Sequence, residues 1–156
     1  MFAANRFLAS ATLVGFALAS LFFAQRASSR SPQDPVADVP AYHAQPPQGA
    51  LPSTMNPGEF ADPVVKNAYA AAAKVKKALY QQPCFCHCDR SQGHESLLDC
   101  FASKHGSGCG TCMLEALYTY EQTRKGKIPA QIRACIERGE WKAVDLKKYQ
   151  SPLSVK

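Results

Sequence analysis

The sequence predicts a mainly α-helical protein: a small domain of three to four helices with a cysteine-rich loop, preceded by an N-terminal apolar helix and a disordered linker. Three observations carry this prediction. Apolar residues recur at three- and four-residue spacing in the second half of the chain, which is typical of amphipathic helices. The alternation of strands and helices typical of a βαβ fold is not visible. Six of the seven cysteines lie between residues 84 and 112, in and around one loop.

An uncharged apolar run covers residues 7–24, directly after Asn5 and Arg6. The run is close to the lower limit of about 20 residues for spanning a bilayer, and it is somewhat long for the core of a signal peptide. Residues 1–26 are therefore interpreted as a signal peptide or a transmembrane anchor, and both alternatives stay open. Either one predicts export to the periplasmic or extracellular face, with the protein anchored to the cytoplasmic membrane or secreted.

The next segment, residues 27–58, is rich in Pro, Ser, Ala, Gln and Asp and carries seven prolines. Such a composition has few large apolar side chains to offset the entropy of ordering the chain, and its prolines favour extended backbone. We expect a Pro-rich disordered linker here, and a folded domain over residues 59–156.

The first helix of this domain is expected to begin at Asp62-Pro63, because aspartate is a good N-cap and proline is favoured at the first helical position. The helix should end before Pro83, since a proline disfavours helical backbone at the preceding residue. A short helical turn is expected further on, around Leu98. The inward residues of the first helix recur at helical spacing: Val65, Ala68, Tyr69, Ala72, Val75 and Leu79.

A second helix is predicted from about Gly110 to Lys125, with Gly126 available as its C-cap. Polar residues opposite its apolar stripe are expected to face solvent, namely Glu115, Thr119 and Gln122. A third helix should run from Pro129 to before Gly139, with Cys135 on its buried side as a core thiol. The stripe of the second helix comprises Cys109, Cys112, Met113, Ala116, Leu117 and Tyr120.

The loop between the first two helices holds Cys84, Cys86 and Cys88 at every second position. If this stretch is extended, its three thiols point to the same side. A disulfide between such near neighbours would close a small, strained ring. The spacing therefore favours a single cation or a small metal cluster over disulfides within the loop.

A second group of candidate ligands lies at the start of the second helix, where Cys109 and Cys112 form a Cys-x-x-Cys pair. A helix N-terminus favours the thiolate, which is the form that coordinates metal. His105 can fold back toward this pair across the glycines between them. The complete set of predicted metal ligands is Cys84, Cys86, Cys88, Cys100, His105, Cys109 and Cys112.

Other chemistries fit the sequence less well. Cys109 to Cys112 has the spacing of a thioredoxin active site without the βαβ context, and Met113 stands where a covalent haem site needs histidine. The net charge is +6, but the lysines are scattered, and nucleic-acid binding is not expected of an exported chain. No nucleophile, base and orienting acid occur together, so we do not expect an enzyme.

The motifs resemble a family of bacterial exported proteins of uncharacterised function that is named for a Pro-Cys-Tyr-Cys-Gly-Cys motif. The resemblance covers roughly Tyr69 to Trp141. The sequence departs from the motif in having Phe85 where the family has tyrosine and His87 where the family has glycine. It also has no lipobox cysteine, although many members of the family are lipoproteins. Since the family has no known function, it implies none here. The matching motifs are Pro83 to Cys88, His94, Leu98 to Phe101, His105, Cys109 to Cys112 and the helix with Ile132-Arg133.

The function predicted from the residues is soft-metal binding, with Cu(I) sequestration or transfer through clustered cysteines as the first reading. A structural Zn(II) site and a disulfide-stapled or thiol-redox interaction module remain alternatives. The expected partners are the metal ion, the membrane through the N-terminal segment, and a metal-donor or metal-acceptor protein.

Overall fold

A computed structural model describes residues 38–153, and the expected apolar helix at residues 7–24 lies outside this range. Within the described residues the protein is mainly helical and contains no β-strand, which confirms the predicted helical class. The expected number of three to four helices was wrong, because this part of the chain forms seven α-helices, four of them only four or five residues long. No helix in this part of the chain is long and apolar enough to cross a membrane. The helical elements in chain order are η1 (Pro57–Glu59), α1 (Pro63–Lys74), α2 (Lys76–Leu79), α3 (Cys88–Gln92), α4 (Asp99–Ala102), α5 (His105–Gly108), α6 (Gly110–Arg124), α7 (Pro129–Glu137), η2 (Glu140–Ala143) and η3 (Leu146–Tyr149).

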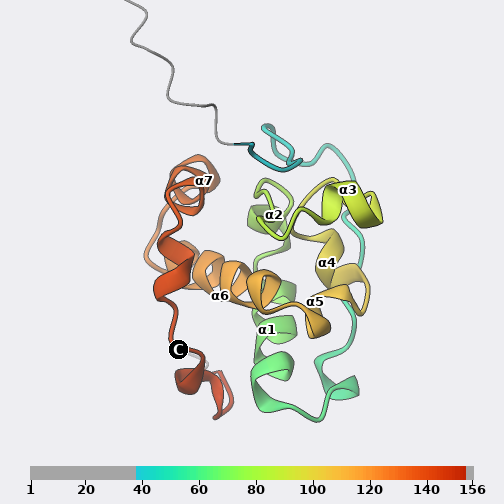
Figure 1. The fold of residues 1–156 in the computed structure, drawn as a ribbon, viewed down its shortest axis with the longest axis vertical. Helices are drawn as coiled ribbons and strands as arrows, with labels where there is room; N and C mark the ends of the chain where they lie inside the picture. The colour runs from blue at the N-terminus through green and yellow to red at the C-terminus, as the bar shows by residue number, and fades with distance from the viewer. Residues whose placement is uncertain (1–37, 154–156) are drawn as a thin grey trace, which may run out of the picture. The chain divides into compact units, whose positions relative to one another are not determined.

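The longest helix, α6, lies at the centre of the domain. Figure 1 shows it running across α1, with α7 on one side and the short helices α3, α4 and α5 on the other. Because neighbours pack around it, Glu115, Thr119 and Gln122 are buried, and the prediction that they face solvent was wrong. Thr119 compensates by donating its hydroxyl to the Glu115 carbonyl at 2.8 Å.

The predicted start of α1 and the predicted end of α6 agree with the structure. Asp62 caps α1 by accepting from the backbone N–H groups of Val64 and Val65. Beyond the end of α6, Gly126 has φ +82, its N–H donates to the Thr123 carbonyl, and the next N–H donates to Gln122. This pair of hydrogen bonds is a Schellman motif, which glycine favours because it adopts positive φ without strain.

The helix expected from Asp62 to Pro83 is interrupted at Val75. This residue has φ −125 and ψ 30, outside the helical region, and separates α1 from α2. Its N–H donates to the Ala72 carbonyl three residues back, at 3.1 Å. The chain therefore reaches Pro83 through the short, separate helix α2 rather than through a continuous one.

Residues 38–58, which the composition assigned to the linker, lie against the helices. The ring of His43 stacks on Tyr80 with centroids 3.9 Å apart, and Leu51 and Met55 pack against the main core. The Met55 N–H also donates to the Phe101 carbonyl at 2.9 Å. The folded unit thus begins before the boundary expected at residue 59.

Replacing Met55 by alanine should lower the free energy of unfolding by about 1 to 2 kcal/mol, less than for a fully buried methionine because this side chain is only partly covered. Urea unfolding of the reduced protein would measure the change. Gln45→Ala, at an exposed position of the same segment, is the matched control. Equal stability of the two variants would mean that the packing of the Met55 side chain adds nothing to the fold.

Candidate metal centre

Six cysteines and two histidines are brought together by the short elements around α6. The loop after α2 carries Cys84 and Cys86, while Cys88 opens α3. Cys100 lies in α4, and His105 is the first residue of α5. The remaining members are Cys109, the N-cap of α6, Cys112 in its first turn, and His94, which follows α3. All seven residues predicted as ligands therefore lie in one place, with His94 added.

The cysteine loop is a turn rather than the extended segment assumed from its spacing. The N–H of His87 donates to the Cys84 carbonyl at 3.0 Å, and the sulfurs of Cys84 and Cys86 lie 3.3 Å apart. The sulfurs of Cys84, Cys86 and Cys88 still lie within 4.8 Å of one another. The three thiols therefore come together because the loop turns, and not because side chains alternate along an extended strand.

The α6 side of the cluster, Cys86, His105, Cys109 and Cys112, is a group of four donor atoms all within 4.8 Å of one another. The Cys86 sulfur lies 3.5 Å from Nε2 of His105 and 3.6 Å from the sulfur of Cys112. Ligands about 2.3 Å from one tetrahedral ion would be about 3.8 Å apart. The observed spacing is therefore close to that of a four-coordinate site.

The α3–α4 side forms a second group with the same limit of 4.8 Å, made of Cys88, His94, Cys100 and again His105. The sulfurs of Cys88 and Cys100 are 3.4 Å apart, and Nδ1 of His94 lies 3.4 Å from the Cys100 sulfur. His94 was not among the ligands predicted from the sequence. Its place among the motifs that match the family is the sequence signal that could have pointed to it.

Cys84 lies between the two sides. Its sulfur belongs to one group with Cys86 and Cys88 and to another with Cys100 and Cys112. The sulfurs of Cys84 and Cys112 are 3.4 Å apart, which directly joins the cysteine loop to the first turn of α6. The cysteine loop and the start of α6, which hold the two groups of candidate ligands identified from the sequence, are therefore in contact.

The cluster is mostly buried, but some of its donors are partly accessible to solvent. Four of its thiols are almost completely buried, whereas Cys86 and Cys109 are partly exposed. His94 and His105 are also partly exposed. An ion could reach the buried sulfurs through these partly exposed residues. The buried thiols are Cys84, Cys88, Cys100 and Cys112.

The thiols differ in how readily they ionise. Hydrogen bonding with Cys84, followed by that with His105, lowers the pKa of Cys86 to about 5 against the cost of burial. Hydrogen bonding with Cys100 and Cys112 likewise lowers the pKa of Cys88. Hydrogen bonding with Cys100 and burial raise the pKa of Cys112, so the thiolate is favoured at Cys86 and Cys88 over Cys112.

A buried carboxyl group lies directly beside the sulfurs. Glu115 is completely buried, and its Oε1 accepts from the Phe85 N–H at 3.0 Å, while Oε2 has no hydrogen-bond partner. Burial raises the pKa of Glu115 to about 8, although the Phe85 N–H opposes the shift. Glu115 was predicted to face solvent because it lies opposite the apolar stripe of its helix. Helical periodicity alone does not show how many sides of a helix are covered by neighbours.

Among the three glycines before and at the start of α6, only Gly106 has a close backbone approach. A β-carbon at this position would lie 2.9 Å from the Cys100 carbonyl oxygen and 3.1 Å from the Phe101 ring. Gly108 and Gly110 have nothing within 4 Å of such an atom. Gly106 therefore allows α5 to pack against α4, which positions His105 near Cys100.

His87 occupies none of the candidate ligand groups. Its backbone has φ 56 and ψ 35, the only positive φ of a non-glycine residue in the described range. Glycine tolerates this left-handed conformation without the cost that a β-carbon brings. The position therefore suits a glycine on conformational grounds, independently of metal.

Replacing His87 by glycine is expected to leave metal stoichiometry unchanged and to raise stability by up to about 1 kcal/mol, because the strain of the left-handed backbone is removed. The change also deletes a buried imidazole nitrogen, Nδ1, that has no hydrogen-bond partner. Metal analysis and thermal unfolding of the reduced protein would measure both effects. Loss of a bound ion in this variant would instead identify His87 as a ligand.

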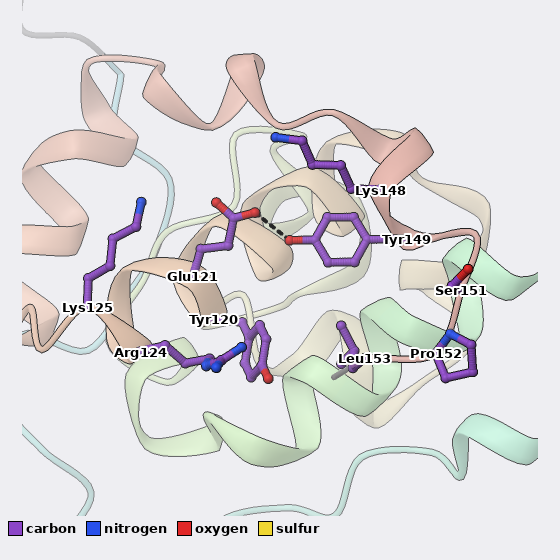
Figure 2. Close-up of a pocket in the computed structure, with 9 residues that line it drawn as sticks. All are labelled: Tyr120, Glu121, Arg124, Lys125, Lys148, Tyr149, Ser151, Pro152 and Leu153. Atoms are coloured by element: carbon purple, nitrogen blue, oxygen red, sulfur yellow. Dashed lines mark hydrogen bonds between the residues drawn. The ribbon is translucent and has the colours of Figure 1, made fainter. Parts of the chain in front are cut away.

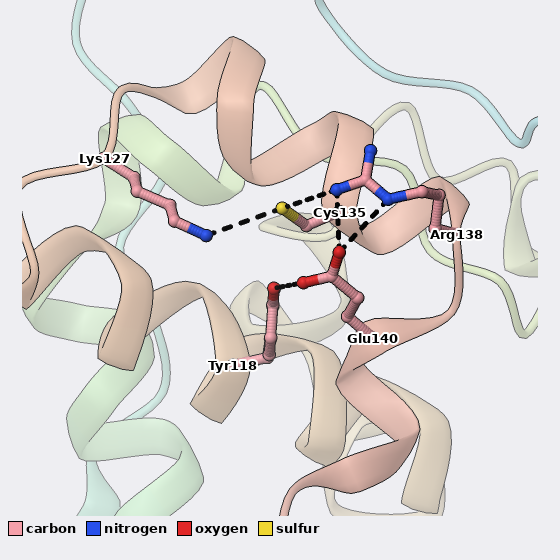
Figure 3. Close-up of polar contacts among 5 residues, drawn as sticks. All are labelled: Tyr118, Lys127, Cys135, Arg138 and Glu140. Carbon is pink, nitrogen blue, oxygen red and sulfur yellow. Dashed lines mark hydrogen bonds and ion pairs between the residues drawn. The ribbon is translucent and has the colours of Figure 1, made fainter.

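The seventh cysteine, Cys135, lies away from the cluster in a second core with Tyr118, Ile132, Ile136 and Trp141. Figure 3 shows Lys127 and Arg138 approaching its sulfur, with Nζ and Nη2 at 3.6 and 3.2 Å. The thiol is buried, as expected, but it has cationic as well as apolar neighbours. Cys135 belongs to none of the ligand groups.

A cavity of about 440 Å³ lies between the last turns of α6 and the C-terminal segment. Figure 2 shows Tyr120 and Arg124 on one side of it, and Tyr149 donating its hydroxyl to Glu121. This cavity contains no thiol or imidazole. It provides no donors to the sulfur cluster.

The fold and the cluster together define a small helical domain built around a sulfur-rich candidate metal site. A family model described as "Protein of unknown function with PCYCGC motif" matches residues 47–144, well over half of the chain. The protein therefore belongs to the PCYCGC family, as its motifs suggested. No curated protein and no solved structure matched the chain.

The loop geometry also accounts for the glycine in the motif that names the family. In the order Pro-Cys-Tyr-Cys-Gly-Cys, the glycine corresponds to His87, where the backbone is left-handed. The three motif cysteines correspond to Cys84, Cys86 and Cys88, whose sulfurs converge. The motif thus combines three thiols with the residue that most easily forms the turn between them.

Proposed function

We propose that this protein is an exported or membrane-anchored metal-binding protein that sequesters or transfers Cu(I). The observation that carries the proposal is the convergence of six thiols and two imidazoles on one mostly buried cluster. Thiolates are costly to bury without a compensating charge, so a buried set of ionised thiols is best stabilised by a cation.

The thiol content supports a soft ion. Thiolate-rich sites select Cu(I), Zn(II) and similar metals, whereas oxygen ligands suit harder ions. The partly exposed Cys86 and Cys109 offer a route by which an ion could pass to or from a partner protein. That route favours transfer or sequestration over a wholly closed structural site.

A structural Zn(II) site is a second candidate, and a specific observation supports it. Cys86, His105, Cys109 and Cys112 form a Cys₃His group, which is one of the standard donor sets of structural zinc. In this role the ion would hold the cysteine loop against the start of α6. Metal binding would then stabilise the fold without being transferred.

A disulfide-stapled or thiol-redox module is the alternative from another functional class. The sulfurs of Cys84 and Cys112, and those of Cys88 and Cys100, are each 3.4 Å apart. A disulfide requires about 2.05 Å, so small movements would join either pair. Oxidising compartments favour this outcome for an exported protein.

Anaerobic purification followed by thiol titration and elemental analysis tests the proposal. The metal-binding protein is expected to retain six cluster thiols in reduced form and to bind Cu(I) in competition with a Cu(I)-specific chelator. Tight Zn(II) binding with weak Cu(I) binding would favour the structural zinc site. Few free thiols, with metal bound only after reduction, would favour the disulfide module.

Export remains a proposal that rests on the apolar run at residues 7–24. A reporter fused after Lys156 should be active only outside the cytoplasmic membrane. Fractionation of the same cells would distinguish an anchored protein from a secreted one. Reporter activity in the cytoplasm would contradict the proposed location.

A further inference from the structure

The cluster contains twice as many donors as one tetrahedral ion can use. A four-coordinate ion bound by the α6 side would engage Cys86, His105, Cys109 and Cys112. It would leave Cys84, Cys88, Cys100 and His94 in place, three of them almost fully buried thiols. The unused residues are themselves the right number and type for a second ion.

The donors of the second set also lie close to one another, independently of the donors on the α6 side. The sulfurs of Cys88 and Cys100 are 3.4 Å apart, and His94 Nδ1 is 3.4 Å from Cys100. The rings of His94 and His105 are nearly perpendicular, with centroids 5.1 Å apart. The two imidazoles therefore lie side by side, one available to each half of the cluster.

Cys84 connects the halves. Its sulfur is within 4.8 Å of Cys88 and Cys100 on one side, and it is 3.3 and 3.4 Å from Cys86 and Cys112 on the other. A thiolate has more than one lone pair and can bridge two soft cations. Its central, almost completely buried position is the one that such a shared ligand requires.

Charge favours two ions over one. Six thiolates around a single divalent cation would leave four net negative charges largely out of water, whereas two cations would leave two. Buried charge that is not compensated is strongly unfavourable, so the second ion would stabilise the deprotonated cluster. With Cu(I), a second ion also lowers the net negative charge of the cluster, although each ion then compensates only one charge.

We infer that the cluster is a two-ion thiolate centre, in which Cys86, Cys109, Cys112 and His105 hold one ion, Cys88, Cys100 and His94 hold the other, and Cys84 is shared. The inference rests on the proposed metal-binding function. It adds the number of ions, the bridging thiolate and a ligand role for His94.

Titration of the reduced full-length protein with Cd(II), followed by native mass spectrometry, tests the number of ions, because Cd(II) is a soft probe for both halves. Two ions per chain are expected. One ion per chain would overturn the two-ion centre while leaving metal binding intact. Failure to bind Cd(II), Zn(II) or Cu(I) at all would instead overturn the proposed function, and the inference with it.

Variants test the division between the halves. His94→Gln should lower the affinity for one of the two ions by roughly 100-fold, because His94 is one of the four ligands of that ion. The affinity for the other ion should not change. His87→Gly is the matched control, because His87 lies in the cysteine loop outside every ligand group, and it should keep both ions. Circular dichroism would verify the fold of each variant. Two ions of unchanged affinity in His94→Gln would overturn the assignment of His94.

The shared ligand has its own spectroscopic signature. With ¹¹³Cd(II) bound, two NMR resonances are expected, each split by the other through the bridging sulfur of Cys84. Cys84→Ser should remove this splitting, while Cys135→Ala should preserve it. Two unsplit resonances in the unsubstituted protein would show two separate sites and would overturn the bridging role of Cys84.

Discussion

Replacing Cys109 and Cys112 together by serine is expected to remove the ion on the α6 side and to loosen the docking of the cysteine loop in one coupled event. The Cys112 sulfur lies 3.4 Å from Cys84 and 3.6 Å from Cys86, so the pair joins α6 to the loop. A structural zinc site contributes about 10 to 16 kcal/mol over four ligands. Loss of two thiolates should therefore weaken that ion by at least roughly 10³-fold.

Competitive titration of the reduced variant with Cu(I) and Zn(II) would measure the affinity, and thermal unfolding with and without metal would measure the stabilisation that metal brings. Cys135→Ala is the control, since Cys135 lies in a separate core. It should cost on the order of 1 kcal/mol for a small buried group and leave the number of bound ions unchanged. The same stoichiometry and affinity in the double variant as in the native protein would show that the α6 cysteines are not ligands.

Replacing Glu115 by glutamine is expected to stabilise the reduced, metal-free protein at alkaline pH. Because burial raises the pKa of Glu115 to about 8, the folded protein retains a proton that the unfolded chain releases from about pH 4.5 upward. The unfolded state then binds fewer protons, so the contribution of Glu115 makes stability fall as pH rises through this window. At pH 8 the penalty is on the order of 4 kcal/mol.

Glutamine cannot ionise, and its side-chain oxygen can still accept from the Phe85 N–H. Urea unfolding of both proteins at pH 5 and pH 8, with reductant and a chelator, would measure the difference. The thiols of Cys84, Cys86 and Cys88, which influence Glu115, are present in both proteins and largely cancel in the comparison. Glu137→Gln, at an exposed position of α7, is the control. A stability difference that does not change between the two pH values would contradict a proton held by Glu115.

Local signals predicted much of the secondary structure. The Asp62-Pro63 start of α1, the end of α6 at Gly126 and the span of α7 follow from capping and from the backbone preferences of proline and glycine. These preferences act over a few residues, so they are readable without tertiary information. The break at Val75 was missed because the apolar spacing continues across it.

The membership of the candidate site was also largely predictable, because cysteines at such density are themselves a signal. His94 was missed because a single histidine near leucines also fits a packing role. Its contact with Cys100 depends on how the segment from α3 to α4 folds back, which spacing does not specify. The role of residues 38–58 was missed for a similar reason: a Pro-rich composition predicts little core of its own, but it does not exclude packing against another segment.

The helical class, the start of α1, the end of α6, the family and the set of thiols could be predicted from the sequence alone, because each depends on residue type and short-range spacing. The tertiary structure determines which donors meet, because the sulfurs of Cys84, Cys88, Cys100 and Cys112 come from four separate segments of the chain. It also decided that Glu115 is buried, since the number of neighbours around α6 is a property of the assembled domain. Contacts between distant segments carry no local signature, and for that reason the two-sided arrangement of the cluster emerges only in the folded chain.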